Sequence, residues 1–202
     1  MNLQSGIEQY NRFAQKPATH ILNGTDIDRD LIQDTSAFKT IKSILKHKKS
    51  VKEKLFFLIK ELSKRAEVHD DSKLQQPEIN WLIEMDREPR YPYGSKEYFE
   101  KMKRWSKFFE HHYKMNRHHP DHFESLGILG MTLVDLAEYL CDIISYFDEM
   151  HVADAIKTIE DQQARFGLDE QLAQVLKNTL IEYYTWIGNE KPIALEPGES
   201  KV

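Results

Sequence analysis

Five of the nine histidines in this chain lie within one short stretch, EHHYKMNRHHPDH. They are His111, His112, His118, His119 and His122. Neutral imidazole is a good ligand for zinc, iron, manganese and nickel, whereas imidazoles held together without a cation repel one another when protonated. A solvated surface patch would also account for the cluster, so it indicates a metal site only together with other ligands.

Carboxylates that could complete such a site occur in two other places. His69 and Asp70 are adjacent where a helical pattern ends. Neighbours on a regular helix point about 100° apart, so both reach one ion only at a helix end or a distorted turn. Asp135, Glu138 and Asp142 are spaced by three and four residues and therefore share one helix face. The simpler alternatives are a polar helix end and a solvated acidic stripe.

Helical periodicity predicts the elements that position these residues. In the first half of the chain, apolar residues recur at three- and four-residue steps from Ser36, a candidate N-cap, to about Arg65. Pro77 suits the first turn of a second helix. Ser95 is predicted to cap a long helix that runs through His112.

The second half of the chain shows the same helical periodicity. Residues 116–130 contain a proline and two glycines and are predicted to form a loop. Thr132 is predicted to cap the next helix, and two more helices are expected near residues 152–166 and 169–186. Strand patterns are nearly absent. The fold class is therefore predicted to be all-α, a compact bundle of six or seven helices.

Length and composition predict one helical domain at residues 36–187, with an N-terminal extension at residues 1–35 and a flexible tail at residues 188–202. The net charge is -5, so nothing marks the whole chain as a nucleic-acid binder. The single cysteine, Cys141, excludes a disulfide framework and suits a reducing cytoplasm. No apolar run is long enough for a membrane span, and an oligomer is compatible with the sequence.

One group of basic residues stands out against this background. It consists of Lys46, Lys48, Lys49, Lys52 and Lys54. A solvated helix face explains it most simply. The alternative is a positive rim that attracts a phosphorylated substrate.

Six stretches of the chain closely resemble an uncharacterised family that is common in phages and bacteria. They are HKKSV, RAEVHDDSKLQQPE, YGSKEY, HHYKMNRHHPDHF, MTLVDLAEYLCD and QQARFGL, and they span about residues 44 to 180. The order of candidate ligands, His, then His-Asp, then Asp, resembles that of the HD-domain metal-dependent phosphohydrolases. This resemblance implies an HD-like helical metal-binding domain.

The resemblance also implies roles for individual residues. The four ligand positions of an HD site would be His47, His69, Asp70 and Asp142. Between Asp70 and Lys73, many HD proteins have an apolar residue and a glycine, but this chain has Asp71 and Ser72. The loop geometry is therefore open, and Asp71 could compete with Asp70 as the ligand.

Further residues resemble those that act on a second ion or on the substrate. His112 and either His118 or His119 would hold the second ion or move a proton, and Lys73 would approach a substrate phosphate. The catalytic residues implied are Asp70, Lys73, His112 and His118. The metal would be one or two divalent ions of manganese, magnesium, cobalt, iron, nickel or zinc.

Four more residues are candidates for the surroundings of the site. Asn116 and Arg117 would contact the substrate, or cap the helix and shape the loop. Tyr93 would border the substrate pocket, although packing is the simpler role for a single tyrosine. Glu138 would bind a ligating histidine from behind and fix its tautomer.

These residues support one leading functional hypothesis and two alternatives. The leading hypothesis is metal-dependent hydrolysis of a small-molecule phosphoester, in particular a nucleotide. The first alternative is an HD-fold di-iron oxygenase, because the same ligands suit iron. The second is a phage-encoded binding or inhibitory module with a structural metal, since function does not follow from fold. The expected location is the cytoplasm, that of the host if the protein is phage-encoded.

Overall fold

The computed structural model describes residues 35–92, 94–147 and 152–190. These residues form seven α-helices and two 3₁₀ segments and contain no strand, which confirms the all-α prediction. In chain order the elements are α2 (Thr35–Val68), η2 (Asp71–Leu74), α3 (Glu78–Asp86), α4 (Lys96–Arg104), α5 (Ser106–Met115), η3 (Pro120–Gly130), α6 (Leu133–Ser145), α7 (Val152–Phe166) and α8 (Glu170–Glu190). The predicted N-terminal extension, except for its last residue, and most of the predicted tail lie outside the described residues.

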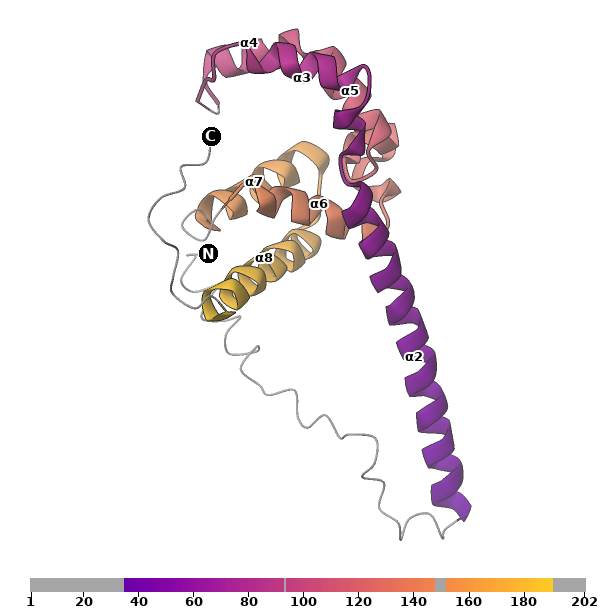
Figure 1. Ribbon diagram of the computed structural model, residues 1–202. Helices are drawn as coiled ribbons and strands as arrows, with labels where there is room; N and C mark the ends of the chain where they lie inside the picture. Colours follow the sequence, from indigo (N-terminus) through magenta and orange to yellow (C-terminus); the bar gives the residue numbers. More distant parts are fainter. Residues whose placement is uncertain (1–34, 93, 148–151, 191–202) are drawn as a thin grey trace.

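The first described helix, α2, is one continuous element of 34 residues. Ser36 lies inside it, one residue after the first described residue of the helix, and not at a cap. Only the C-terminal part of α2 packs on α6, where Arg65 forms ion pairs with Asp135 and Glu138. Figure 1 shows the rest of α2 extending away from the other helices.

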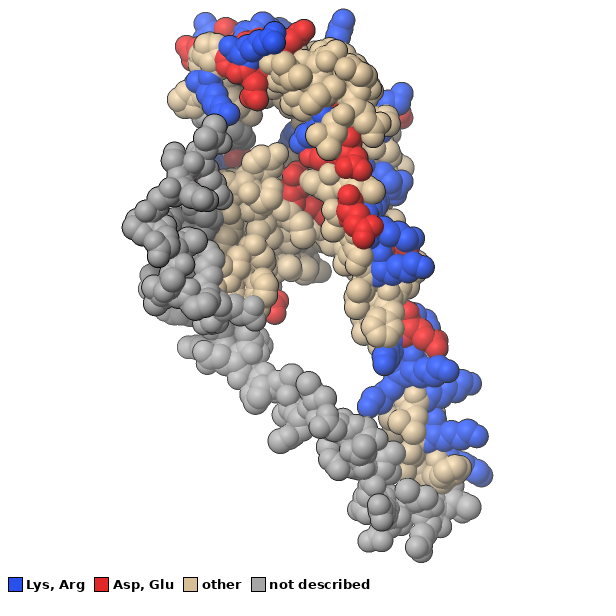
Figure 2. Space-filling view, viewed as in Figure 1, with Lys and Arg blue, Asp and Glu red and all other residues tan. Residues whose placement is uncertain are grey.

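The extended part of α2 carries two kinds of exposed side chain. Figure 2 shows lysine and arginine side chains gathered along it. The exposed large apolar side chains of the whole helix are Phe38, Ile44, Leu45, Val51, Leu55, Phe56, Phe57, Ile59, Leu62 and Val68. The helical pattern of α2 was therefore predicted correctly, but most of its apolar residues do not join the core described below.

The predicted long helix after Ser95 is two helices, α4 and α5. Ser95 caps α4 as predicted, because its Oγ accepts a hydrogen bond from the Tyr98 backbone N–H at 3.1 Å. The break falls at Trp105, with φ -94° and ψ 17°. Its indole N–H donates to a carboxylate oxygen of Glu88 at 3.0 Å, a contact to the segment that precedes α4. Sequence periodicity contains no signal for such a tertiary contact.

The predicted loop at residues 116–130 contains the 3₁₀ segment η3. Glu124 and Gly127 interrupt it, with φ values of 52° and 50°. After η3, Thr132 caps α6 as predicted: its side chain accepts from the Asp135 backbone N–H, and the Asp135 carboxylate accepts from the Thr132 backbone N–H. This reciprocal pair of bonds fixes where α6 begins.

The hydrophobic core lies among α6, α7 and α8, which pack side by side (Figure 1). Gly167 ends α7 with φ 66°, and Asp169 accepts a hydrogen bond from the Leu172 backbone N–H at the start of α8, as predicted. The last helix continues to Glu190, past the predicted domain end at residue 187. Across the described part of the chain, no helix has the length and apolar character to cross a bilayer. The core anchors α6, which carries two carboxylates of the site below.

Candidate metal centre

The His-Asp pair lies directly after the C-terminus of α2. Asp70 has a left-handed backbone with φ 58° and ψ 18°, a conformation that residues with a side chain rarely adopt. The turn is closed by a hydrogen bond from the Lys73 backbone N–H to the Asp70 carbonyl at 2.8 Å. It places one Asp70 carboxylate oxygen 3.6 Å from His69 Nε2. A local distortion of this kind often occurs at functional sites, and here it directs two adjacent side chains to one point.

The histidine stretch supplies two deeply buried imidazoles to the same point. His112 on α5 is 3% exposed, and His118 is 1% exposed. Their Nε2 atoms lie 3.3 Å and 3.5 Å from Oδ1 of Asp70. Three polar atoms here are buried and have no hydrogen-bond partner in the described part of the chain: Asp70 Oδ1, His118 Nε2 and His119 Nε2. Buried polar atoms are nearly always paired, so this convergence of unpaired ligand atoms fits a bound cation.

A carboxylate lies behind two of the imidazoles. Oε1 of Glu138 accepts a hydrogen bond from His69 Nδ1 at 3.0 Å and lies 3.3 Å from His118 Nδ1. With the proton on Nδ1, each imidazole presents the lone pair of Nε2 toward Asp70, as a metal ligand requires. This is the location that the sequence predicted for Glu138.

A second carboxylate, Glu78, supports α5 in the same way. It is fully buried, and its Oε2 accepts hydrogen bonds from His112 Nδ1 at 3.0 Å and from the Ser72 hydroxyl at 2.9 Å. Its Oε1 binds His111 Nδ1 at 2.8 Å. Burial opposes ionisation, but these hydrogen bonds outweigh it and lower the pKa of Glu78. Sequence reasoning did not single out Glu78, although it ends the motif RAEVHDDSKLQQPE.

The candidate ligand atoms form two overlapping groups. One contains Asp70, His112, His118 and His119, and the other contains His69, Asp70, His118 and Asp142. Within each group the ligand atoms lie within 4.8 Å of one another, which suits an ion with ligand bonds of about 2.0–2.2 Å. These buried histidine and aspartate groups can therefore hold a metal ion, as predicted. Asp71 is exposed and belongs to neither group.

The protonation states of these groups suit a cation. Burial, together with the positive charge that His118 and His112 would carry, lowers the pKa of His119 to about 2. Burial opposes ionisation of Asp70, but its ion pair with Lys73 outweighs this and lowers the pKa of the carboxyl group. His119 is therefore neutral and Asp70 is ionised at pH 7, which are the forms that bind metals.

The structure does not bring His47 to this centre. His47 is exposed on α2. The helix runs without a break from His47 to Val68, the residue before His69. At about 1.5 Å rise per residue the two histidines are roughly 33 Å apart along the helix axis. The structure therefore corrects the prediction that His47 is a ligand. The fourth residue beside His69, Asp70 and Asp142 is His118.

The predicted substrate-contacting residues have other partners or fall outside the description. The Asn116 amide donates to the Ser72 hydroxyl and to the His112 carbonyl, both at 2.8 Å. Arg117 holds both carboxylate oxygens of Asp135, at 3.1 Å and 3.0 Å. Tyr93 lies outside the described residues. Asn116 and Arg117 therefore hold residues that surround the candidate ligands.

Lys73 lies beside the candidate ligand Asp70. Its ammonium group forms an ion pair with Oδ2 of Asp70, and its side chain is 30% exposed. Burial opposes the charge on Lys73, but the hydrogen bond and the charge of Asp70 outweigh it and raise the pKa. Lys73 is therefore a fixed cation beside the candidate ligands.

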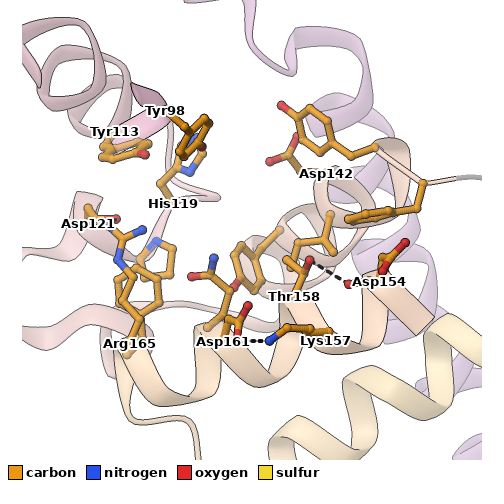
Figure 3. A pocket seen from close by; sticks show the side chains of 17 residues that line it. Tyr98, Tyr113, His119, Asp121, Asp142, Asp154, Lys157, Thr158, Asp161 and Arg165 are labelled. Atoms are coloured by element: carbon orange, nitrogen blue, oxygen red, sulfur yellow. Dashed lines mark hydrogen bonds and ion pairs between the residues drawn. The ribbon is translucent and has the colours of Figure 1, made fainter. Parts of the chain in front are cut away.

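A cavity of about 700 Å³ opens beside the centre. His119 and Asp142 belong both to its lining and to the ligand groups, and Figure 3 shows them at one edge of it. Helices α6 and α7 form much of the remaining wall. Sequence reasoning missed most of the lining, because its residues are scattered along five segments of the chain.

Comparison with known proteins gives one match. No curated protein and no solved structure matches the chain. A family of unknown function matches residues 36–182, which include the whole metal centre and the cavity. The chain therefore belongs to this family of unknown function, DUF5662.

Proposed function

We propose that the protein is a metal-dependent phosphohydrolase of the HD type, acting on a nucleotide or a related phosphoester. The observation that carries the proposal is the convergence of His69, Asp70, His118 and Asp142 beside a cavity. The HD resemblance implies a ligand set of one histidine, a His-Asp pair and a further aspartate. Here His118 takes the position that was expected for His47. The cavity gives a substrate access to these ligands.

The two overlapping groups support one or two ions. A single imidazole nitrogen binds one ion, whereas a carboxylate has two oxygens and can bridge two. If two ions bind, Asp70 would contribute to holding both, because Oδ1 lies near Nε2 of His112 and His118 and Oδ2 lies near Nε2 of His69. When bound, divalent ions polarise a phosphoryl group and lower the pKa of water.

The protein's own residues supply the rest of the chemistry. Lys73 would offset charge on the substrate phosphate, since its ammonium group is next to the shared carboxylate. His119 is neutral, lies between the ligand group and the cavity, and has an unpaired Nε2. His119 would therefore accept a hydrogen bond from an attacking water at this nitrogen and orient it.

A paired substitution tests the proposal. Purified protein loaded with manganese, cobalt or magnesium is offered p-nitrophenyl phosphate and a panel of nucleotides, and released phosphate is measured. His118→Ala should lower bound metal and turnover by at least about 100-fold, because it removes a ligand common to both groups. His47→Ala is the control and should change neither. Absence of turnover on every ester, despite bound metal, would contradict the proposal.

The histidine content of the first group also favours a second candidate, a di-iron oxygenase. Three imidazoles and one carboxylate form a ligand set that suits iron at least as well as magnesium. Metal analysis of protein purified without oxygen separates the two candidates. Bound iron with a mixed-valence spectroscopic signal would favour the oxygenase, and activity with manganese or magnesium alone would favour hydrolysis.

A further inference from the structure

The cavity beside the candidate metal centre has a lining that a metal site alone would not require. Aromatic rings form a large part of it, and they come from α4, α5, α6, the segment just after α6 and α7. They are Tyr98, Tyr113, Tyr139, Tyr146, Phe147 and Phe166. A cavity of about 700 Å³ is in the size range of small-molecule sites, and aromatic walls bind flat rings.

Two buried polar atoms of the lining have no hydrogen-bond partner among the residues that the structure describes. The Tyr139 side chain is 5% exposed, and its hydroxyl has no hydrogen bond. The amide oxygen of Gln162 is also buried without one. A buried polar group without a partner destabilises the folded protein, so such groups are rare. Two of them in one cavity indicate a ligand that offers an N–H donor to Gln162 and an acceptor to Tyr139.

The charges of the lining exclude a second phosphate from the cavity. Its lysine and arginine are already paired at the rim: Lys157 lies 3.0 Å from Asp161, and Arg165 lies 3.1 Å from Asp121 (Figure 3). Asp142 and Asp154 add further carboxylates to the lining. The part of a ligand that enters the cavity is therefore neutral or cationic.

Resting on the proposed phosphohydrolase function, we infer that the substrate is a nucleoside monophosphate. Its phosphate lies at the metal centre beside Lys73. Its nucleobase occupies the cavity, stacked on the aromatic rings and hydrogen-bonded to the Tyr139 hydroxyl and the Gln162 amide oxygen. A nucleobase is neutral, stacks on tyrosine and phenylalanine, and presents a donor and an acceptor on one edge. A triphosphate would bring additional negative charge toward Asp142 and Asp154.

Equilibrium binding tests the nucleobase site without requiring catalysis. The full-length protein is titrated calorimetrically with adenosine, guanosine, cytidine and uridine. At least one nucleoside should bind, and Tyr139→Phe should weaken that binding roughly five- to tenfold, the effect of one neutral hydrogen bond. The melting temperature of Tyr139→Phe should be unchanged or higher, since the lost hydroxyl is unpaired. Tyr183→Phe, on α8 outside the lining, is the matched control and should bind as the parent does.

The outcomes separate this inference from the proposed function. Failure of all four nucleosides to bind, or equal binding by Tyr139→Phe, would overturn the nucleobase site even if simple phosphate esters are hydrolysed. Tighter binding of nucleoside triphosphates than of monophosphates would overturn it as well. Nucleoside binding that depends on Tyr139, without phosphate release from the monophosphate, would support the site and count against the hydrolase.

Discussion

Glu138 connects two imidazoles of the candidate centre through one oxygen atom. The same carboxylate forms an ion pair with Arg65 at 3.0 Å, so it also attaches α6 to α2. Burial opposes ionisation of Glu138, but the contacts with His118 and His69 outweigh it and lower the pKa. The ionised form is the one that fixes the tautomers of both imidazoles.

Glu138→Gln should therefore weaken metal binding without removing a ligand. An amide carries no charge, and its NH₂ group would face Arg65 where Oε2 now accepts, so its remaining oxygen would hold the two Nδ1 protons more weakly. We expect a loss of about 10- to 100-fold in metal affinity, measured by competition with a chelator. Glu182→Gln, on the exposed side of α8, is the control. Unchanged affinity in Glu138→Gln would show that Glu138 does not orient the ligands.

Asp135 is a buried carboxylate next to the site. Its protonation at low pH should reduce the stability of the folded protein. Burial opposes its ionisation, but hydrogen bonds from Arg117 and Thr132 outweigh burial and lower the pKa from 3.8 to about 2. The carboxyl group thus stays ionised to lower pH in the folded protein than in the unfolded chain. Its contribution to stability is complete above about pH 4 and is lost as pH falls toward 2.

Asp135→Asn should lower the free energy of unfolding by about 2 kcal/mol at pH 7, because two arginines lose their charged partner while remaining partly solvated. The same variant should show a weaker loss of stability between pH 4 and pH 2. Urea unfolding at several pH values measures both effects. Asp86→Asn, at an exposed position on α3, should follow the parent protein at each pH. A parallel acid profile in Asp135→Asn would contradict this assignment.

At the scale of elements, the end of η3 contains a close contact that a substitution can test. The Phe123 side chain packs against the backbone of Gly130, shortly before α6 begins. A Cβ atom on Gly130 would lie 2.7 Å from Cβ of Phe123. The guanidinium carbon of Arg117 in turn lies over the Phe123 ring, 5.0 Å from the ring centroid. Displacing Phe123 would therefore also disturb the arginine that holds Asp135.

Gly130→Ala should destabilise the protein by about 1–3 kcal/mol, the usual cost of overpacking. Chemical denaturation measures this cost. Gly188→Ala is the matched control, because a Cβ there meets nothing within 4 Å and alanine favours a helix over glycine. The control should be neutral or slightly more stable. Equal stability of the two variants would show that η3 adjusts without strain.

At the scale of the whole molecule, the metal centre joins segments far apart in the chain. The end of α2, helix α5, the segment before η3 and helix α6 each contribute ligand atoms. A bound ion would stabilise their contacts, since it binds the folded chain more tightly than the unfolded one. Without it, Asp70 Oδ1 and the Nε2 atoms of His118 and His119 are buried with no hydrogen-bond partner among the described residues.

Removal of metal should therefore lower the melting temperature. Metal at about 1,000 times its dissociation constant contributes roughly 4 kcal/mol, which corresponds to about 10 °C for a chain of this size. Thermal melts with and without a chelator measure this, and added manganese or zinc should restore the parent value. His118→Ala should melt at a temperature that no longer depends on the chelator. A chelator-insensitive parent protein would indicate that no ion binds at the centre.

The sequence by itself determined most helices and the chemical types of the ligands. Helix ends at Ser95, Thr132 and Asp169 follow from side chains that bond to backbone groups three residues away, so local pattern is sufficient. Asp70 and His118 were predicted as ligands because the histidine cluster is unusual and because the order of histidines and aspartates resembles an HD site. The family of unknown function matches residues 36–182, a range that includes the stretches at about residues 44 to 180 that resemble an uncharacterised family.

Only the tertiary structure decided which ligands meet. His47 and His118 are equivalent as imidazoles, yet a continuous α2 carries His47 away while the segment after α5 buries His118. Glu78 and the partners of Asp135 were missed for the same reason. Helix periodicity reports contacts within one or two turns, whereas these contacts join residues that are more than about 15 positions apart. Their convergence depends on how the helices pack, and no local pattern records that packing.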